Sequence, residues 1–268
     1  MERIRIQYDE LYEYYIIRQM RTKEIAMIYN TTPNTIIRKL HKYNIPVRTS
    51  EQTNRKYYFN EDYFNEINTK EKAYVLGLIC ADGWVAKNKY NNANLLAISL
   101  QQKDLDVIVF VKEQLETNKK IIIKNNSASI DFCSCKMARV LVDYGVVPNK
   151  SLQLSLKEVI RVANIKNEFI PSFLLGYFDG DGGIYESQGQ WSCGFTGTLE
   201  TCIFLKEWFS CGFIVDEKSK SGNTYTFKIS GRNQVFANLS KLYDIHNSFS
   251  MGRKKEKFLV LKSLLNQK

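Results

Sequence analysis

Hydrophobic and polar positions repeat with two different periods along this 268-residue chain. A spacing near 3.6 residues, with apolar side chains on one side, predicts helices over residues 9–20, 22–29, 33–43 and 104–117. Polar and apolar side chains alternate with a period of two over 127–132, 190–196 and 224–230, and 94–101 is rich in apolar residues. These four segments are predicted strands, and the alternation is typical of a sheet with one buried and one solvated face.

The first three helices form a group of their own. Thr22 and Thr32 can cap the second and third helices, and Pro33 suits the first position of the third. Two short helices joined by a tight turn resemble a helix-turn-helix, whereas the alternative is a three-helix cap with a solvated basic face. We predict a DNA-binding domain over 1–43 and a basic linker over 44–57, either extended along a groove or a plain tether. The candidate DNA-binding residues here are Thr35, Arg38, Lys39, Lys42 and, in the linker, Arg48.

An internal repeat is the most informative pattern in the chain. Residues 74–84 and 173–184 align without gaps around Gly77 and Gly176, and the alignment pairs Asp82 with Asp181, 99 residues further on. Each copy is an apolar helix with small residues four positions apart, which lets two helix backbones approach closely. The predicted helix-interface residues are Gly77, Ala81, Gly176 and Gly180.

If these two helices pack side by side, Asp82 and Asp181 meet at one end. Two carboxylates at the negative ends of two helix dipoles need cations, and oxygen ligands favour Mg²⁺ or a similar hard divalent ion. A two-metal site beside a polyanion-binding surface is typical of phosphodiester hydrolysis. A single copy of the motif would equally fit a buried helix with an exposed capping aspartate.

Composition and charge agree with a nucleic-acid partner. Lys and Arg total 38 against 28 Asp and Glu, which gives a net charge of +10. The excess is greatest per residue in 1–57, with 11 basic and 6 acidic side chains, and an anionic membrane surface is the weaker alternative. Two histidines and six cysteines without a CxxC pair make a zinc site unlikely. With no apolar run long enough to span a membrane, we expect a soluble intracellular protein of the cytoplasm or nucleoid.

The two motifs resemble those of the monomeric, two-motif LAGLIDADG homing endonucleases, here with an N-terminal helix-turn-helix module. The resemblance covers about residues 58–268 and implies an α+β fold, in which two pseudo-symmetric αββαββα halves, 58–157 and 158–268, form a saddle of antiparallel sheets. It implies a Mg²⁺-dependent, site-specific double-strand DNA endonuclease that acts as a monomer on a long pseudo-palindromic target in intron homing. Two or more divalent ions are expected, and Mn²⁺ could substitute.

The resemblance also assigns site residues. The metal ligands are Asp82 and Asp181 with the neighbouring positions Ala81 and Gly180. Gln102 and Lys103 resemble the polar pair that orders active-site solvent, while the second half lacks the glutamine near Gly197 and Thr198. Lys150 resembles a lysine that faces the cleavage centre, and Lys254, with Arg253 as rival, is its second counterpart. The catalytic set is therefore Asp82, Asp181, Gln102, Lys150 and Lys254, and the sheet residues expected to contact DNA are Lys103, Lys124, Ser127, Ser129, Gln190, Thr224, Thr226, Lys228 and Arg253.

Two alternatives remain on the same fold. A DNA-binding regulator that does not cut is one, although such a protein would gain nothing from two anionic groups near phosphates. An RNA maturase that binds its host intron RNA is the other, and no sequence feature excludes it.

Overall fold

The computed structural model describes residues 6–49, 52–53, 57–87, 94–147, 150, 153–217, 224–243 and 249–266. The chain divides into two compact units, Met1–Lys56 and Tyr57–Lys268, which are taken one at a time below. Residues 50–51 and 54–56 of the predicted linker lie outside the described residues. None of the described helices is long and apolar enough to cross a membrane.

The first unit is a small helical body. It contains α1 (Tyr8–Tyr12), which continues directly into η1 (Glu13–Ile17), then α2 (Thr22–Ile28) and α3 (Pro33–Lys42). As predicted, Pro33 is the first residue of α3, and the Thr32 hydroxyl accepts a hydrogen bond from the backbone N–H of Thr35 at 3.3 Å. Ile28, the last residue of α2, is 51% exposed. The buried core comprises Ile6, Leu11, Tyr15, Ile25, Ala26, Ile36, Leu40 and Ile45.

The folded part of this unit extends beyond the predicted boundary at residue 43. Ile45 belongs to the same core, and the Arg48 guanidinium lies 4.2 Å from the centroid of the Tyr15 ring. Arg48 also donates to the carbonyl oxygens of Gln19, at 3.0 Å, and of Met20. Residues up to Arg48 therefore pack against the helices, whereas the sequence pattern assigns them to a linker.

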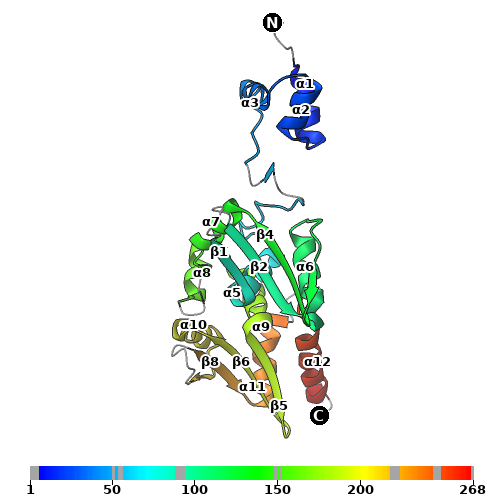
Figure 1. Ribbon diagram of the computed structural model, residues 1–268. Coiled ribbons are helices and arrows are strands. Elements are labelled where there is room, and N and C mark those ends of the chain that lie inside the picture. The colour runs from blue at the N-terminus through cyan, green and yellow to red at the C-terminus, as the bar shows by residue number, and fades with distance from the viewer. Residues whose placement is uncertain are drawn as a thin grey trace. The chain divides into compact units, whose positions relative to one another are not determined.

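The second unit contains two successive αββαββα repeats, so the predicted α+β fold with two pseudo-symmetric halves is confirmed (Figure 1). The first repeat comprises α5 (Lys70–Asp82), β1 (Gly83–Lys87), β2 (Asn94–Gln101), α6 (Leu105–Gln114), β3 (Ile122–Lys124), β4 (Ser127–Cys133) and α7 (Cys135–Asp143). The second comprises α9 (Ile170–Asp181), β5 (Gly182–Ser187), β6 (Gln190–Gly197), α10 (Leu199–Phe209), β7 (Phe213–Asp216), β8 (Tyr225–Ser230) and α11 (Arg232–Tyr243). Shorter elements and a last helix complete the unit: η2 (Gln102–Asp104), α8 (Leu156–Val162), η4 (Asn167–Phe169) and α12 (Gly252–Asn266).

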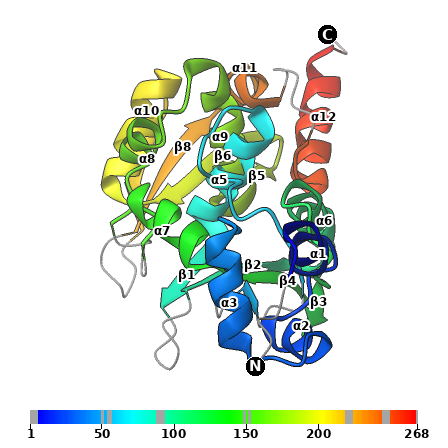
Figure 2. The ribbon, with the colours of Figure 1, turned by 90° about the horizontal axis from the view of Figure 1, so that it is seen from above.

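Each repeat builds one antiparallel sheet of four strands. The strand orders are β1-β2-β4-β3 and β5-β6-β8-β7, so the two sheets have the same topology. Along β4 the residues alternate between buried and half-buried, which leaves one face of the sheet against the core and the other toward solvent. Figures 1 and 2 show α5 and α9 next to each other between the two sheets. One hydrophobic core runs through both halves, so they form a single folded body.

Candidate active site

The C-terminal ends of α5 and α9 meet where the two halves pack together. A Cβ atom on Gly180 would lie 2.3 Å from the Cβ of Ala81 and 2.9 Å from Oδ2 of Asp82. Small residues are therefore needed where the last turns of the helices touch, as the repeat predicts. α5 ends at Asp82 and α9 ends at Asp181, so the packing brings the two motif carboxylates to the same end of the helix pair.

Both carboxylates are in an environment that opposes their negative charge. Burial, followed by the charge on Asp82, raises the pKa of Asp181 to about 6. Burial also raises the pKa of Asp82, although the positive charges of Lys254 and Lys150 act in the opposite direction. The C-terminal end of a helix carries a partial negative charge, which adds to the repulsion. A cation bound between these side chains would therefore be strongly favoured.

The two predicted lysines lie at corresponding places on the two helix ends. Lys150 is buried and donates from Nζ to the carbonyl oxygen of Ala81 at 2.5 Å. Lys254 is also buried and donates to the carbonyl oxygens of Phe178 and Gly182, both at 2.6 Å. Burial lowers the pKa of the Lys150 ammonium and lowers that of Lys254 to about 8. Each lysine thus places a positive charge at the C-terminal end of a motif helix, where the last carbonyl groups carry a partial negative charge.

The oxygen atoms at this position fit a hard divalent cation. The predicted ligands are the carboxylates of Asp82 and Asp181 and the backbone at Ala81 and Gly180. The Gly180 carbonyl oxygen lies 3.4 Å from Nζ of Lys254, and the Ala81 carbonyl oxygen accepts from Lys150. Each of these two carbonyls therefore faces a lysine ammonium. Among the described residues, no group of three or more His, Cys, Asp or Glu side chains could hold a metal ion. Two carboxylates therefore supply only part of a coordination shell, and water or phosphate oxygens would have to complete it.

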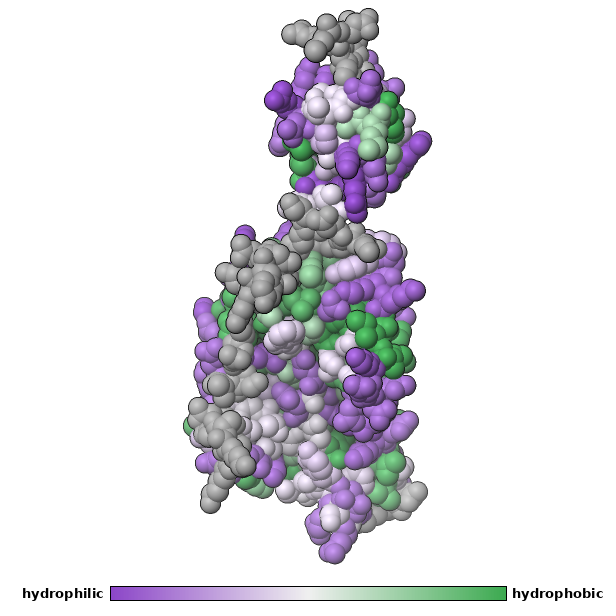
Figure 3. Space-filling view, in the orientation of Figure 1, coloured by the Kyte–Doolittle hydropathy of each residue, from purple (hydrophilic) through white to green (hydrophobic). Residues whose placement is uncertain are grey.

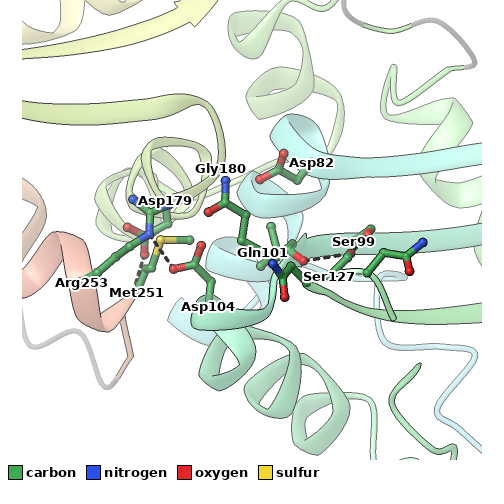
Figure 4. Close-up of a pocket in the computed structure, with 12 residues that line it drawn as sticks. Asp82, Ser99, Gln101, Asp104, Ser127, Asp179, Gly180, Met251 and Arg253 are labelled. Carbon is green, nitrogen blue, oxygen red and sulfur yellow. Dashed lines mark hydrogen bonds and ion pairs between the residues drawn. The ribbon is translucent and has the colours of Figure 1, made fainter. Parts of the chain in front are cut away.

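A polar pocket of about 640 Å³ opens beside Asp82, which lines it, whereas Asp181 does not (Figure 4). Gln101, the last residue of β2, lines this pocket, whereas Gln102, the predicted solvent-ordering residue, does not. Gln102 begins η2 and its backbone N–H donates to the carbonyl oxygen of Asn126 at 2.8 Å. The predicted strand over 94–101 coincides with β2, and it is Gln101, the residue before the predicted one, that lines the pocket. The lining residues are Asp82, Ser99, Leu100, Gln101, Asp104, Asn125, Asn126, Ser127, Asp179, Gly180, Met251 and Arg253.

The second half has no amide at the corresponding position. Thr198 follows β6, is buried, and donates from its hydroxyl to the carbonyl oxygen of Leu154 at 2.6 Å. It also caps α10 by accepting from the backbone N–H of Thr201. The two helix ends are therefore flanked by different side chains, as the sequence predicts.

A network that the sequence did not reveal joins the two halves next to the pocket. Asp179 is completely buried, and its Oδ2 accepts from the Tyr74 hydroxyl at 2.8 Å and from the backbone N–H of Met251 at 2.7 Å. Burial raises the pKa of Asp179 to about 6. Nearby, Arg253 forms an ion pair of 2.6 Å with the buried Asp104 (Figure 4). These contacts fix the start of α12, which carries Lys254, against the first half.

The polar faces of the sheets carry several of the predicted DNA-contacting residues. Lys103, Lys124 and Gln190 are exposed, while Ser127 and Ser129 are half-buried along β4. Lys228 is half-buried and lies 3.6 Å from a carboxylate oxygen of Glu217. Thr224 precedes β8 and is half-buried. Figure 3 shows one face of this unit, where hydrophilic side chains predominate and hydrophobic patches are isolated.

Two predicted DNA-contacting residues are less available than the sequence suggests. Thr226 is buried, and its hydroxyl lies 3.5 Å from that of Thr196 on the adjacent strand, so its place on the same side of β8 as Lys228 does not leave it open to solvent. Arg253 is committed to Asp104, as described above, although its side chain is 42% exposed.

In the first unit, the basic face of α3 is only partly free. Arg38 and Lys42 are exposed, whereas Lys39 is half-buried. The Thr35 hydroxyl lies 3.1 Å from that of Thr32 and takes part in the helix cap. Arg48 contacts its own unit through Tyr15, Gln19 and Met20, as described above. Arg38 and Lys42 therefore remain the best-placed cations of this unit for a polyanion.

Comparison with known proteins identifies the fold. A lysine-to-alanine variant of I-SmaMI matches with a TM-score of 0.50 and 15% identity, covering 72% of this chain and 92% of that chain. I-SmaMI bound to cleaved DNA, described as a LAGLIDADG homing endonuclease, matches at 0.48 and 16% identity over 74% of this chain and 89% of that one. The I-LtrWI LAGLIDADG homing endonuclease bound to target DNA matches at 0.48 and 14% identity, over 78% and 92%. No family model and no curated protein matches the sequence. The chain therefore has the fold of I-SmaMI, as the repeat predicts.

Proposed function

We propose that this chain, which shares the LAGLIDADG fold, is a site-specific double-strand DNA endonuclease that functions in homing. The observation that carries the proposal is the meeting of Asp82 and Asp181 at adjacent helix ends beside a polar pocket. Burial raises the pKa of both carboxyl groups, and the charge on Asp82 raises that of Asp181 further, so the pair is suited to divalent cations. The net charge of +10 and the description of I-SmaMI as a homing endonuclease support DNA as the substrate.

Asp82 and Asp181, with the carbonyl oxygens of Ala81 and Gly180, would hold two or more Mg²⁺ ions, which Mn²⁺ could replace. When bound, these ions supply a more acidic water and positive charge for the developing phosphorane. Lys150 and Lys254 hold the helix-terminal carbonyls and add positive charge next to the carboxylates. In the first half the Gln101 amide can orient a water molecule in the pocket, which Gln102 does not line.

The rest of the molecule would determine where the DNA is held. The polar faces of the two sheets offer Lys124, Gln190 and Lys228 to phosphates and base edges, and the exposed Lys103 in η2 adds a further cation. Both halves of the site belong to one chain, so a monomer can contact both halves of a nearly symmetric target. The helical first unit, through Arg38 and Lys42, would extend the contact along one flank. We propose that this unit is a DNA-binding helix-turn-helix, with residues 49–57 as the linker and 58–157 and 158–268 as the two halves.

The test is cleavage of a randomised double-stranded DNA library in Mg²⁺, with chelator and Asp181→Asn as controls. The proposal predicts metal-dependent cuts at a long, nearly symmetric sequence that the control variant does not make. A protein that selects a duplex but never cuts it would be a regulator instead. Tighter retention of intron RNA than of any duplex on a filter would indicate a maturase.

A further inference from the structure

Each half of the second unit has an exposed aromatic ring close to its motif aspartate. Trp84, in β1, is 55% exposed, and Tyr185, in β5, is 57% exposed. Their neighbours Val85 and Ile184 are buried in the core. Because successive side chains of a strand point to opposite faces, both rings lie on the solvated face of their sheet.

The two rings occupy equivalent places, although they come from positions that do not align. Trp84 is two residues beyond Asp82, and the residue two beyond Asp181 is Gly183. A Cβ atom on Gly183 would lie 2.4 Å from Oη of Tyr185 and 2.6 Å from Cζ. The Tyr185 ring therefore bends back over Gly183 and fills the place that Trp84 has in the other half.

Small residues on the adjacent strands leave these rings uncovered. Trp84 is paired across the sheet with Ala97, and Gly183 with Gly194. A single exposed aromatic side chain is common on protein surfaces. Two at matching places, one in each half, indicate a shared ligand that presents apolar groups to both halves. In a DNA duplex the faces of the bases are covered by their neighbours, but the thymine methyl group is open to apolar side chains in the major groove.

We propose that Trp84 and Tyr185 contact the nucleobases next to the two scissile phosphates, one ring in each half. The inference rests on the proposed function, which brings those phosphates to Asp82 and Asp181. Trp84 lies two residues beyond Asp82, and Tyr185 lies four beyond Asp181 with its ring turned back over Gly183, so a base beside such a phosphate comes close to a ring in each half. The rings then contribute to affinity and to base preference at the centre of the target.

The first experiment measures binding of the selected target duplex, in chelator, by Trp84→Ala and Tyr185→Ala. Each loss of a base contact should weaken binding roughly 5- to 150-fold, the range for one good contact with a base edge in a duplex. The control is Tyr58→Ala, which truncates another exposed ring of the same unit before α5 and should change affinity less than about twofold. Trp84→Phe and Tyr185→Phe keep a ring and should retain most of the affinity.

The second experiment couples each ring to a base. An abasic nucleotide beside a cleavage site should weaken wild-type binding but cause no further loss in the variant that lacks the facing ring. Gly183→Ala supplies an independent variant, because the added Cβ displaces the Tyr185 ring. It should weaken binding like Tyr185→Ala and have no effect when added to it.

The inference would be overturned if both alanine variants bound the duplex with wild-type affinity. It would also be overturned if the loss from each variant added in full to the loss from every central abasic nucleotide. A wild-type protein that selects and cuts a duplex while its rings prove dispensable refutes only this inference. A wild-type protein that selects no duplex refutes the proposed function itself.

Discussion

A Cβ atom on Gly77 would lie 1.9 Å from the carbonyl oxygen of Phe173, so the backbones of α5 and α9 touch without a side chain between them. The relationship is reciprocal, because a Cβ on Gly176 would lie 2.0 Å from the carbonyl oxygen of Tyr74. The two contacts are related by the pseudo-symmetry of the repeat. They determine how closely the two helix ends, and hence the two aspartates, can approach.

Gly77→Ala and Gly176→Ala should each destabilise the protein by about 3 kcal/mol or more, because backbone atoms cannot move aside as a side chain can. The measurement is the free energy of unfolding in denaturant. Gly183→Ala is the matched control, since its Cβ would meet only the mobile end of Tyr185, and its effect should be below about 1 kcal/mol. Equal stability of all three variants would show that the helices are not packed at these glycines.

The Arg253–Asp104 ion pair should contribute to the stability of the fold, because its Asp104 partner is buried. Arg253→Ala leaves Asp104 buried and unpaired, so we expect a loss of about 2 kcal/mol in unfolding free energy, less than for a wholly buried pair because Arg253 is partly exposed. Adding Asp104→Asn should recover part of that loss by removing the uncompensated charge. A double variant that is less stable than Arg253→Ala would contradict this account of the pair.

Metal-free stability should depend on pH through Asp181 and Asp179. Burial raises the pKa of both to about 6, whereas an aspartate in the unfolded chain titrates near 3.9. The folded protein therefore holds these protons more tightly, and its stability falls as pH rises from about 4 to about 6.

In chelator, Asp181→Asn should be more stable than wild type at pH 8, by about 1 kcal/mol after allowance for solvent screening, and the difference should shrink toward pH 4. Denaturant unfolding at pH 4.5, 6 and 8 measures it. Asp179 remains titratable and should leave a residual slope in the variant. If Asp181→Asn instead lost stability relative to wild type as the pH rises, the predicted direction of the pH dependence would be wrong.

The first unit should contribute phosphate contacts through Arg38 and Lys42. Replacing both with alanine should weaken duplex binding and reduce the slope of log K against log salt by about 2, because each contact releases counterions. Lys23→Ala is the control, an exposed lysine on α2. An unchanged slope in the double variant would show that the DNA phosphates do not contact Arg38 and Lys42.

The repeat predicted most of the fold, because its signals are local. Small residues at fixed spacing and an Asp-Gly helix end identified α5 and α9, and alternation located β4, β6 and β8 closely. The contacts between the halves are tertiary, so local patterns could not predict them. The predicted strand over 94–101 matches β2, but which of two successive glutamines lines the pocket depends on how the chain turns into η2.

Asp179 and Asp104 illustrate the same limit. Each appears in the sequence as one more acidic residue, and only the packing of α9 and α12 on the first half gives Asp179 its Tyr74 and Met251 partners. Arg48 differs because its partners lie in its own unit, yet no periodicity indicates that a residue in a basic stretch covers Tyr15. For Asp179, the repeat does offer one signal, because the aligned residue in the first copy is Cys80 and not an acidic residue.

Parallel measurement of duplex binding and single-turnover cleavage in Asp82→Asn and Asp181→Asn tests the central claim most directly. The assay uses the selected target in Mg²⁺, with wild type beside both variants. We predict that double-strand cleavage falls at least about a hundredfold in each, while binding changes less than about threefold, because the carboxylates hold the ions and not the DNA. Cleavage at close to the wild-type rate in either variant would contradict the assignment of that aspartate to the metal site.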